Sequence, residues 1–412
     1  MNILLINHYA GSPQHGMEYR PYYLAREWMR AGHSVTIIAA SHSHVRTCQP
    51  EISGNITEEY IDGIRYLWIK TPKYHGNSLR RVYNMFVFLV GLYRYGSNSK
   101  YLTKSDLVIS SSTYPMDIWP ARRIARKFGA RLVFEVHDLW PLSPIELGGM
   151  SRWHPFIMMV QAAEDYAYHN ADVVISMLPN VKEYMNSRGL ELEKLTIVPN
   201  GIDPDEWEGE PKPLSKSVIK LFTRLKNEGR TIVGYAGSHG TANALNTLLD
   251  SAKLMKEEQL AFVLVGNGPE KNKLKLFAET NELNNVWFLE PVKKEQIPSL
   301  LKWFDIAYIG WQRQPLYRFG ISPNKLMDYM MSGKPILHAV ESSNDPVTEA
   351  KCGLKVKPED SVAVADGIRK LLAKSESERE KIGFKGHEFV LKNHTYPVLA
   401  RKFLDACRLT AI

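Results

Sequence analysis

Short apolar runs rich in β-branched residues alternate along this chain with longer segments that carry apolar residues at helical spacing. This alternation is typical of βαβ units, in which helices connect parallel strands. The pattern predicts strands at residues 3–7, 35–39, 65–69, 107–111, 132–136, 173–176, 196–198, 231–235, 262–265, 286–289, 306–309, 336–339 and 354–356. The predicted fold class is therefore α/β, with doubly wound parallel sheets.

The alternation is interrupted once. Residues 200–217 read NGIDPDEWEGEPKPLSKS, with three prolines, two glycines and no hydrophobic period, which is a linker composition. We therefore expect two Rossmann-like domains facing a central cleft, the first over residues 1–203 and the second over 218–395, joined by a linker at 204–217.

The composition excludes several other classes of protein. The 412 residues are 44% hydrophobic and 23% charged, which is the range of soluble globular domains and not of disordered or collagen-like chains. The three cysteines, Cys48, Cys352 and Cys407, are far apart and have no metal-ligand spacing, as expected in a reduced cytoplasmic chain. The apolar run at residues 3–6 lacks the basic leader of a signal peptide. The run at 85–92 is shorter than the ~18–20 residues that cross a bilayer.

The formal net charge is +8, and its distribution is uneven. Residues 65–131 contain 13 Lys and Arg against two acidic residues, so this band alone carries +11. Within it, residues 79–95 (LRRVYNMFVFLVGLYRY) place apolar and aromatic side chains between arginines. Such a segment suits a helix lying in an anionic membrane interface, and the alternative is a buried helix of the first domain with solvated ends. Nucleic acid fits less well, because no known binding module accompanies the charge.

The most specific segment runs from Gly320 to Leu337. Ser322 is a good N-cap, Pro323 suits the first helical position, and Gly333 followed by proline ends the helix. The predicted helix therefore points its N-terminus into a loop. The alternative is an ordinary capped surface helix.

Free N–H groups at such a helix start form an anion site. Here they belong to Asn324, Lys325 and Leu326, and Lys325 adds a full charge. Asp328 follows on the same face, where a carboxylate could accept two hydroxyl donors from a ribose.

Two glycine-containing strand ends precede that helix. The first follows the strand at 231–235 and contains Gly237, Ser238, His239 and Gly240. Glycines at such an end let the backbone approach a pyrophosphate. The second is Gly266 and Gly268 in FVLVGNGPE. A dinucleotide fingerprint requires a third glycine where this chain has Lys271, so the second loop alone is also consistent with a structural turn.

The first half offers three candidate groups. His137 and Asp138 follow the strand at 132–136, at the sheet edge where ligands of α/β proteins bind, and are either an acid/base pair or a hydrogen-bonded turn. The first strand ends at His8, and the chain continues through Gly16 to Arg20 on the first helix. Arg20 could hold a phosphate or could simply face solvent.

Taken together, these segments resemble the retaining glycosyltransferases of family 4, which have the GT-B fold. The resemblance covers nearly the whole chain. It is carried by Val-His-Asp at 136–138, Val-Pro-Asn-Gly-Ile-Asp at 198–203, Tyr-Ala-Gly at 235–237, Leu-Val-Gly-Asn-Gly-Pro-Glu at 264–270, Phe-Leu-Glu-Pro-Val at 288–292 and Pro-Asn-Lys-Leu-Met-Asp-Tyr-Met at 323–330.

The resemblance implies that the second domain binds a nucleotide-sugar, usually UDP-linked, and that the first binds the acceptor, with candidate contacts at His8, Arg20 and Asp138. His137 would lie near the donor sugar. Gly16 would lie beside the diphosphate, and Asp328 would bind the ribose. Pro291 and Val292 would contact the base, together with Gly266 and Gly268. Residues 396–412 would form a helix that crosses back to the first domain.

The chain also departs from the family pattern. The first acid of the family falls at Gly320, and the usual phosphate-binding arginine and lysine fall at Ser238 and Asn243. Lys325 is then the best source of positive charge, with His239 second. This combination resembles the bacterial N-acetyl-fucosamine transferases of surface polysaccharide synthesis.

The expected acceptor is a saccharide or a polyprenyl-diphosphate-linked sugar, and neither a cofactor nor a metal is expected. Two alternatives stay open. One is a UDP-sugar 2-epimerase with the same two-domain shell, and the other is a non-catalytic GT-B scaffold subunit. A cytoplasmic protein, associated peripherally with the inner face of the membrane through residues 79–95, is expected.

Overall fold

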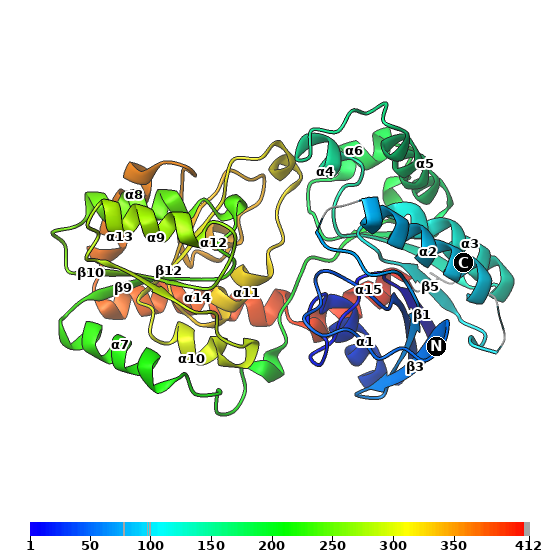
Figure 1. Cartoon of the computed structure of the whole chain (residues 1–412), viewed down its shortest axis with the longest axis horizontal. Helices are drawn as coiled ribbons and strands as arrows, with labels where there is room; N and C mark the ends of the chain where they lie inside the picture. Colours follow the sequence, from blue (N-terminus) through cyan, green and yellow to red (C-terminus); the bar gives the residue numbers. More distant parts are fainter. Residues whose placement is uncertain (77–78, 97, 99, 408–412) are drawn as a thin grey trace. The chain divides into compact units, whose positions relative to one another are not determined.

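The computed structural model describes residues 1–407 except 77–78, 97 and 99. It divides the chain into two compact units. The first comprises Met1–Asn200 together with the segment that starts at Tyr396, and the second is Gly201–Thr395. Both are α/β units with parallel sheets (Figure 1), so the predicted fold class is confirmed.

The first unit contains an eight-stranded sheet in the order β3-β4-β2-β1-β5-β6-β7-β8. All neighbours described are parallel except β3 and β4. The strands are β1 Asn2–Ile6, β2 Ser34–Ala40, β3 Ile56–Ile61, β4 Ile64–Ile69, β5 Leu107–Ser110, β6 Arg131–Val136, β7 Val173–Ser176 and β8 Leu195–Ile197.

Helices cover both faces of this sheet (Figure 1). They are α1 Arg20–Arg30, α2 Leu79–Tyr95, α3 Ile118–Phe128, α4 Leu142–Glu146, α5 Pro155–Asn170, α6 Lys182–Ser187 and α15 Tyr396–Cys407. The helices α1 and α15 share one apolar core with the sheet. In it, the rings of Tyr23 and Tyr396 stack 4.7 Å apart, and Trp28 Nε1 donates to the carbonyl of Ala400 at 3.1 Å.

The second unit contains a six-stranded, all-parallel sheet in the order β11-β10-β9-β12-β13-β14. This is the Rossmann strand order. Successive strands are added on one side of β9 as far as β11 and then on its other side from β12 onwards, and ligands of open α/β sheets bind at this switch point between β9 and β12. The strands are β9 Thr231–Ala236, β10 Leu260–Val265, β11 Val286–Leu289, β12 Ile306–Gly310, β13 Ile336–Ala339 and β14 Gly353–Val356.

Two apolar clusters fill the two sides of the second sheet. One lies under α8 Leu245–Leu254, α9 Lys271–Thr280 and α13 Ser361–Leu372. The other lies under α7 Lys216–Asn227, α10 Ile297–Leu301, α11 Asn324–Met331, α12 Pro346–Ala350 and α14 Glu376–Asn393 (Figure 1).

The segment predicted as a linker, residues 204–217, clusters with the second unit. Glu206 forms an ion pair with Lys294 at 2.8 Å, and the carbonyl of Pro213 accepts from Gln296 at 2.7 Å. Leu214 and Trp207 of this segment also pack into the core of the second unit, so both polar and apolar contacts hold it there. The chain changes units at Asn200 and Thr395, compared with the predicted boundaries at 203 and 395.

Candidate functional site

The second unit gathers its candidate residues at the carboxyl ends of β9 and β10. Two glycine loops pack directly on one another there. A Cβ added at Gly266 would lie 1.8 Å from the carbonyl oxygen of Gly237, and one at Gly268 would lie 2.6 Å from the backbone of His239. Glycine is therefore required at 266 and 268 by the chain's own packing. This agrees with the structural turn, one of the two interpretations of this loop in the sequence. Their contact with a base stays a prediction.

Lys325 reaches back from α11 to the first of these loops. Its Nζ donates to Tyr235 Oη at 2.9 Å and to Asn243 Oδ1 at 2.5 Å. The ammonium also lies 4.9 Å from the ring centre of Tyr235 and 5.7 Å from that of Trp311. A Cβ at Gly237 would stand 3.2 Å from Nζ, so glycine there leaves room for the cation.

The charge of Lys325 is poorly compensated. Its described hydrogen-bond partners are a phenol and an amide, and neither is a carboxylate. Burial lowers the pKa of Lys325 to about 8. A cation that is held without a counter-ion favours an anionic ligand, because such a ligand would repay the cost of its desolvation.

The helix that carries Lys325 starts one residue later than predicted. Its N-cap is Pro323 rather than Ser322, and no side chain caps the first turn. A proline side chain has no acceptor, so the N–H groups near the helix start, including those of Lys325 and Leu326, are free of a capping side chain. The helix ends at Met331, and Gly333 follows with a φ of +68°. The start of α11 thus combines open donors with the ammonium of Lys325.

Asp328 lies one turn along the same helix, half-buried. Burial raises the pKa of its carboxyl to about 7, and the charge of Lys294 lowers it only in part. No described residue donates a hydrogen bond to this carboxylate, and the predicted contact with a ribose would supply hydroxyl donors.

His239 is not a source of positive charge, contrary to the expectation that ranked it after Lys325. The side chain is fully buried, and both ring nitrogens lack a hydrogen-bond partner. Burial, followed by the charges of Lys271 and Lys325, lowers the pKa of His239 to about 4. The imidazole is therefore neutral at pH 7. It fills the space beneath the two glycine loops.

The predicted base-contacting residues Pro291 and Val292 follow β11, where Pro291 is exposed and Val292 packs against the core. Lys271 supports this strand end from below. Its buried Nζ donates to the carbonyls of Gly266 and Leu289 and to Glu290 Oε1, at 2.8, 3.2 and 2.9 Å. The lysine at the position of the missing third glycine thus holds the ends of β10 and β11 together.

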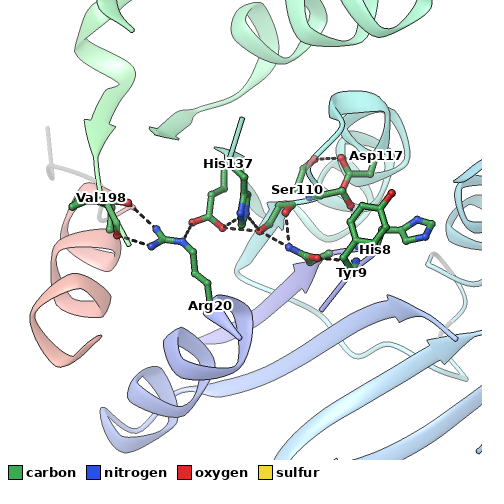
Figure 2. A network of polar contacts seen from close by, with 12 residues as sticks. His8, Tyr9, Arg20, Ser110, Asp117, His137 and Val198 are labelled. Carbon is green, nitrogen blue, oxygen red and sulfur yellow. Dashed lines mark hydrogen bonds and ion pairs between the residues drawn. The ribbon is translucent and has the colours of Figure 1, made fainter. Parts of the chain in front are cut away.

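The first unit contains a buried polar network at the ends of β1, β5 and β6 (Figure 2). Ser111 Oγ donates to Glu135 Oε2 at 2.6 Å and lies 3.0 Å from His137 Nε2. Because the hydroxyl proton is used on Glu135, the Ser111 oxygen accepts from His137, and Nε2 therefore carries a hydrogen. Burial alone would lower the pKa of His137, but the hydrogen bond and charge of Glu135 outweigh it and raise this pKa.

This network fixes the orientation of the His137 ring. Its Nε2 faces the protein, and its Nδ1 makes no hydrogen bond among the described residues. The side chain is 10% exposed. Asp138 beside it is exposed and forms no described hydrogen bond through its carboxylate, so the two do not form an acid/base pair in this structure.

Arg20 belongs to the same network and is not presented to a ligand. It is 1% exposed, its Nε donates to Glu135 Oε1 at 2.9 Å, and its terminal nitrogens donate to the carbonyls of Val198 and Pro199 (Figure 2). The predicted phosphate contact is therefore corrected. Arg20 neutralises Glu135 and holds residues 198–199, just before the chain enters the second unit.

His8 and Gly16 also have internal explanations. His8 is fully buried, its Nδ1 lies 2.6 Å from Tyr114 Oη, and burial lowers its pKa well below the usual value, so it is a neutral core residue and does not face an acceptor. Gly16 has a φ of +93°, and a Cβ there would lie 2.6 Å from Thr47 Oγ1. Its position beside a diphosphate stays a prediction.

Several residues of the two sites escaped the sequence analysis. Glu135 had one usable signal, since a carboxylate inside an apolar strand run requires a buried partner. Ser111 and Trp311 had none, because their partners are distant in sequence. Tyr235 and Asn243 were marked by the family pattern, but their contact with Lys325 was not predicted. Asn243 stands where the family usually has a lysine, and it binds the ammonium of Lys325 instead.

Two family models match the chain in succession. The model described as Glycosyltransferase Family 4 matches residues 15–206, and the model described as Glycosyl transferases group 1 matches residues 219–388. Together with the two Rossmann-like units, these matches define a glycosyltransferase with the GT-B fold. The chain belongs to this family of GT-B glycosyltransferases, with one family model on each of its units.

Known proteins agree with this assignment. The putative colanic acid biosynthesis glycosyl transferase WcaI of Escherichia coli is 23% identical over 84% of this chain and 86% of its own length. Sucrose-phosphate synthase from Thermosynechococcus elongatus has the same fold, with a TM-score of 0.73, 17% identity, and 99% and 98% of the two chains covered. HepE from Anabaena, in complex with UDP and glucose, has a TM-score of 0.66, 16% identity, and 100% and 99% covered.

Two other features concern the part of the chain that the structure describes. No helix among them is both long and apolar enough to span a bilayer. No group of three or more His, Cys, Asp or Glu side chains among them is placed to hold a metal ion.

Proposed function

We propose that the protein is a retaining glycosyltransferase that moves a sugar, an N-acetylated amino sugar, from a UDP-sugar to a saccharide or lipid-diphosphate-linked acceptor during synthesis of a bacterial surface polysaccharide such as an O-antigen or a capsule. The observation that carries the proposal is the uncompensated ammonium of Lys325 at the uncapped start of α11. The UDP bound by HepE supports the base, and the colanic acid assignment of WcaI supports the pathway class.

The donor diphosphate would occupy the space between the start of α11 and the loop at residues 237–240. The backbone N–H groups of α11 and the ammonium of Lys325 would bind its oxygens, and Asp328 would accept the ribose hydroxyls. The neighbouring strand end at Pro291 and Val292 would contact the base. These contacts all come from the second unit.

In the proposed reaction the acceptor hydroxyl attacks the anomeric carbon from the face that the nucleotide leaves. The bond between the anomeric carbon and the β-phosphate oxygen breaks, the new glycosidic bond forms, and the acceptor proton passes to the β-phosphate. No protein nucleophile is needed. Lys325 and the helix N–H groups stabilise the charge that builds on the leaving diphosphate, and one such donor is typically worth ~3–4 kcal/mol. His137 would contact the sugar through Nδ1.

This chemistry requires no cofactor beyond the two substrates. Because Lys325 would supply the charge that a divalent metal supplies elsewhere, we expect transfer to survive chelation by EDTA. Loss of activity with EDTA and recovery with Mg²⁺ or Mn²⁺ would overturn this part of the proposal.

A panel of UDP-, GDP- and dTDP-sugars, tested by thermal shift, identifies the donor. A ligand present at 100 times its Kd stabilises the folded state by about 2.7 kcal/mol. We expect a UDP-sugar to raise Tm in the wild type and to fail in Lys325→Met. A rise in Tm with GDP-sugars only would show that the donor carries guanine and not uracil. A product formed without any acceptor would favour the epimerase, and the absence of any shift would favour the scaffold subunit.

The membrane contact of residues 79–95 gains support from α2. One face of this helix is buried, and the other exposes an apolar stripe at a spacing of three and four residues: Leu79, Tyr83, Phe86, Val90 and Tyr93. Arg80, Arg94 and Arg123 lie beside it, the last with its guanidinium 5.9 Å from the ring centre of Tyr93. An apolar stripe flanked by cations matches an anionic lipid surface. The buried face agrees with the alternative of a core helix with solvated ends, and the exposed stripe supports the proposed membrane contact.

Sedimentation with vesicles of anionic phospholipid tests this contact. We expect Val90→Glu to reduce the bound fraction severely. The matched control is Leu276→Glu on α9, because both side chains are 64% exposed in the wild type. Equal binding of the two variants would overturn the membrane contact and would leave the glycosyltransferase proposal intact.

A further inference from the structure

A chain of three side chains connects the buried end of β13 to Lys325. His338 on β13 lies between Asp345, at the start of α12, and Trp311, which follows β12. His338 Nδ1 is 2.7 Å from Asp345 Oδ1, and Trp311 Nε1 donates to His338 Nε2 at 3.0 Å. The ring of Trp311 in turn lies 5.7 Å from Lys325 Nζ.

The chemistry of the chain fixes one tautomer of His338. An indole N–H can only donate, so Nε2 must accept and the hydrogen of the neutral ring lies on Nδ1, pointing at Asp345. Asp345 is held in turn, because its carboxylate also accepts from the N–H of Val347 and from the hydroxyl of Thr348. Each member of the chain therefore has one donor or acceptor role, and Trp311 has one preferred ring position.

The same loops are joined by a second set of bonds. Asn344 accepts from the N–H of Ile321 at 2.8 Å and donates to its carbonyl at 3.0 Å. Ser343 N donates to the carbonyl of Tyr317 at 3.1 Å. The loop before α12 thus holds the loop at residues 311–323, which leads directly into the first turn of α11.

We propose that Asp345, His338 and Trp311 form a positioning chain that holds the indole ring against Lys325 and so keeps its ammonium aimed at the donor diphosphate. Only the identity of the ligand, a diphosphate, rests on the proposed function. The effect of the three side chains on Lys325 is a property of the free protein. These three are positioning residues, because none of them is expected to touch the reacting atoms.

Protonation of His338 would break the chain. A hydrogen on Nε2 would face the N–H of Trp311, and two donors cannot share a hydrogen bond. Burial lowers the pKa of His338, and Lys355, its neighbour in register on β14, lowers it further, whereas the hydrogen bond and charge of Asp345 raise it in part. The net direction is downward, so the chain stays intact at neutral pH.

The test reads the titration of Lys325 directly. Protein labelled with ¹³C at the ε carbon of lysine is titrated by NMR, and the Lys325 signal is assigned by its loss in Lys325→Met. His338→Phe cannot accept the indole hydrogen bond, so the ring of Trp311 would be released and water would reach the ammonium. We expect the pKa of Lys325, about 8 in the wild type, to rise by about one unit or more.

Three further variants complete the test. Trp311→Phe, at a half-buried position, removes the same hydrogen bond and should shift the pKa in the same direction even if His338→Phe folds poorly. His338→Gln can accept from Trp311 and donate to Asp345, and should restore the wild-type titration. His387→Phe alters a histidine whose Nδ1 bonds the carbonyl of Met331 at the far end of α11, and should change nothing. An unchanged Lys325 titration in both His338→Phe and Trp311→Phe overturns the positioning chain.

Calorimetric titration with UDP separates this inference from the proposed function. If the wild type binds UDP, His338→Phe should weaken binding roughly tenfold or more, and His338→Gln should recover it. Unchanged UDP affinity in His338→Phe would overturn the proposal that these side chains position the Lys325 ammonium toward the diphosphate. If the wild type does not bind UDP, the proposed donor is wrong, while the lysine titration still decides whether the chain acts on Lys325.

Discussion

The unpaired charge of Lys325 leads to a prediction that runs against the usual effect of removing a hydrogen-bonded residue. Substitution by methionine should leave the second unit at least as stable as the wild type at pH 7. Burial lowers the pKa of Lys325 from 10.5 to about 8, which corresponds to a cost of about 3 kcal/mol for the charged form. Because the side chain is partly exposed, we reduce this to about 2–3 kcal/mol.

Two further contributions enter the balance, one against the variant and one in its favour. The hydrogen bonds to Tyr235 and Asn243 are lost in the variant, and each is worth about 1 kcal/mol net. The sulfur of methionine would gain contacts with the rings of Tyr235 and Trp311, worth ~0.3–1.5 kcal/mol. The balance is a gain of about 1 kcal/mol for Lys325→Met at pH 7.

The pH dependence gives the sharper test. The folded protein releases the proton of Lys325 at about pH 8, and the unfolded chain releases it at about pH 10.5. Between these values the cost of burying the charged ammonium disappears from the wild type. In that window the unfolded chain binds more protons, so the stability of the wild type increases with pH relative to the variant. The advantage of Lys325→Met should therefore shrink by about 1–2 kcal/mol between pH 7 and pH 9.5.

Urea unfolding at these two pH values measures the difference. Lys271→Met is the matched control, because that lysine is also buried but bonds two carbonyls and Glu290. It should lose about 2–4 kcal/mol at both pH values. The reasoning is refuted if Lys325→Met is clearly less stable than the wild type at pH 7, or if its difference from the wild type does not change with pH.

Two further predictions concern the other candidate residues. UDP affinity should fall as pH drops through about 7, because Asp328 then gains a proton and accepts fewer hydroxyl donors, and Asp328→Asn should bind UDP weakly with no such pH dependence in calorimetric titration. Arg20→Met should destabilise the first unit by about 3–5 kcal/mol in thermal unfolding, because Glu135 is left charged and buried; a stable variant that loses only acceptor binding would return Arg20 to the role of a ligand contact.

Local pattern was sufficient to predict most of the fold. All the strands predicted from apolar runs are present, because buried parallel strands are predominantly apolar. One strand of the structure, β3, was not predicted. It lies at the edge of its sheet, and its sequence ITEEYI contains polar residues between the apolar ones. Its signal was the dipeptide Asp62-Gly63, where φ values of 50° and 82° form the tight turn of a hairpin.

The candidate site was predicted less completely, for a physical reason. Lys325 could be found from its place at a helix start, which is a local property. Its partners Tyr235 and Asn243 lie 90 and 82 residues away in sequence. Burial also changes what a residue type means. Arg20 and His8 have the chemistry of ligand contacts, yet both are enclosed by residues that no local pattern brings to them.

The packing of α15 on α1 has a consequence for how the protein is made. The first unit lacks part of its core until Tyr396, Leu399 and Phe403 arrive, and these residues are translated only after the entire second unit. Until then Trp28 and Tyr23 have no cover on that face. The second unit, whose residues are contiguous, can close as soon as it leaves the ribosome. The half of the protein that is synthesised first is thus the half whose core is completed last.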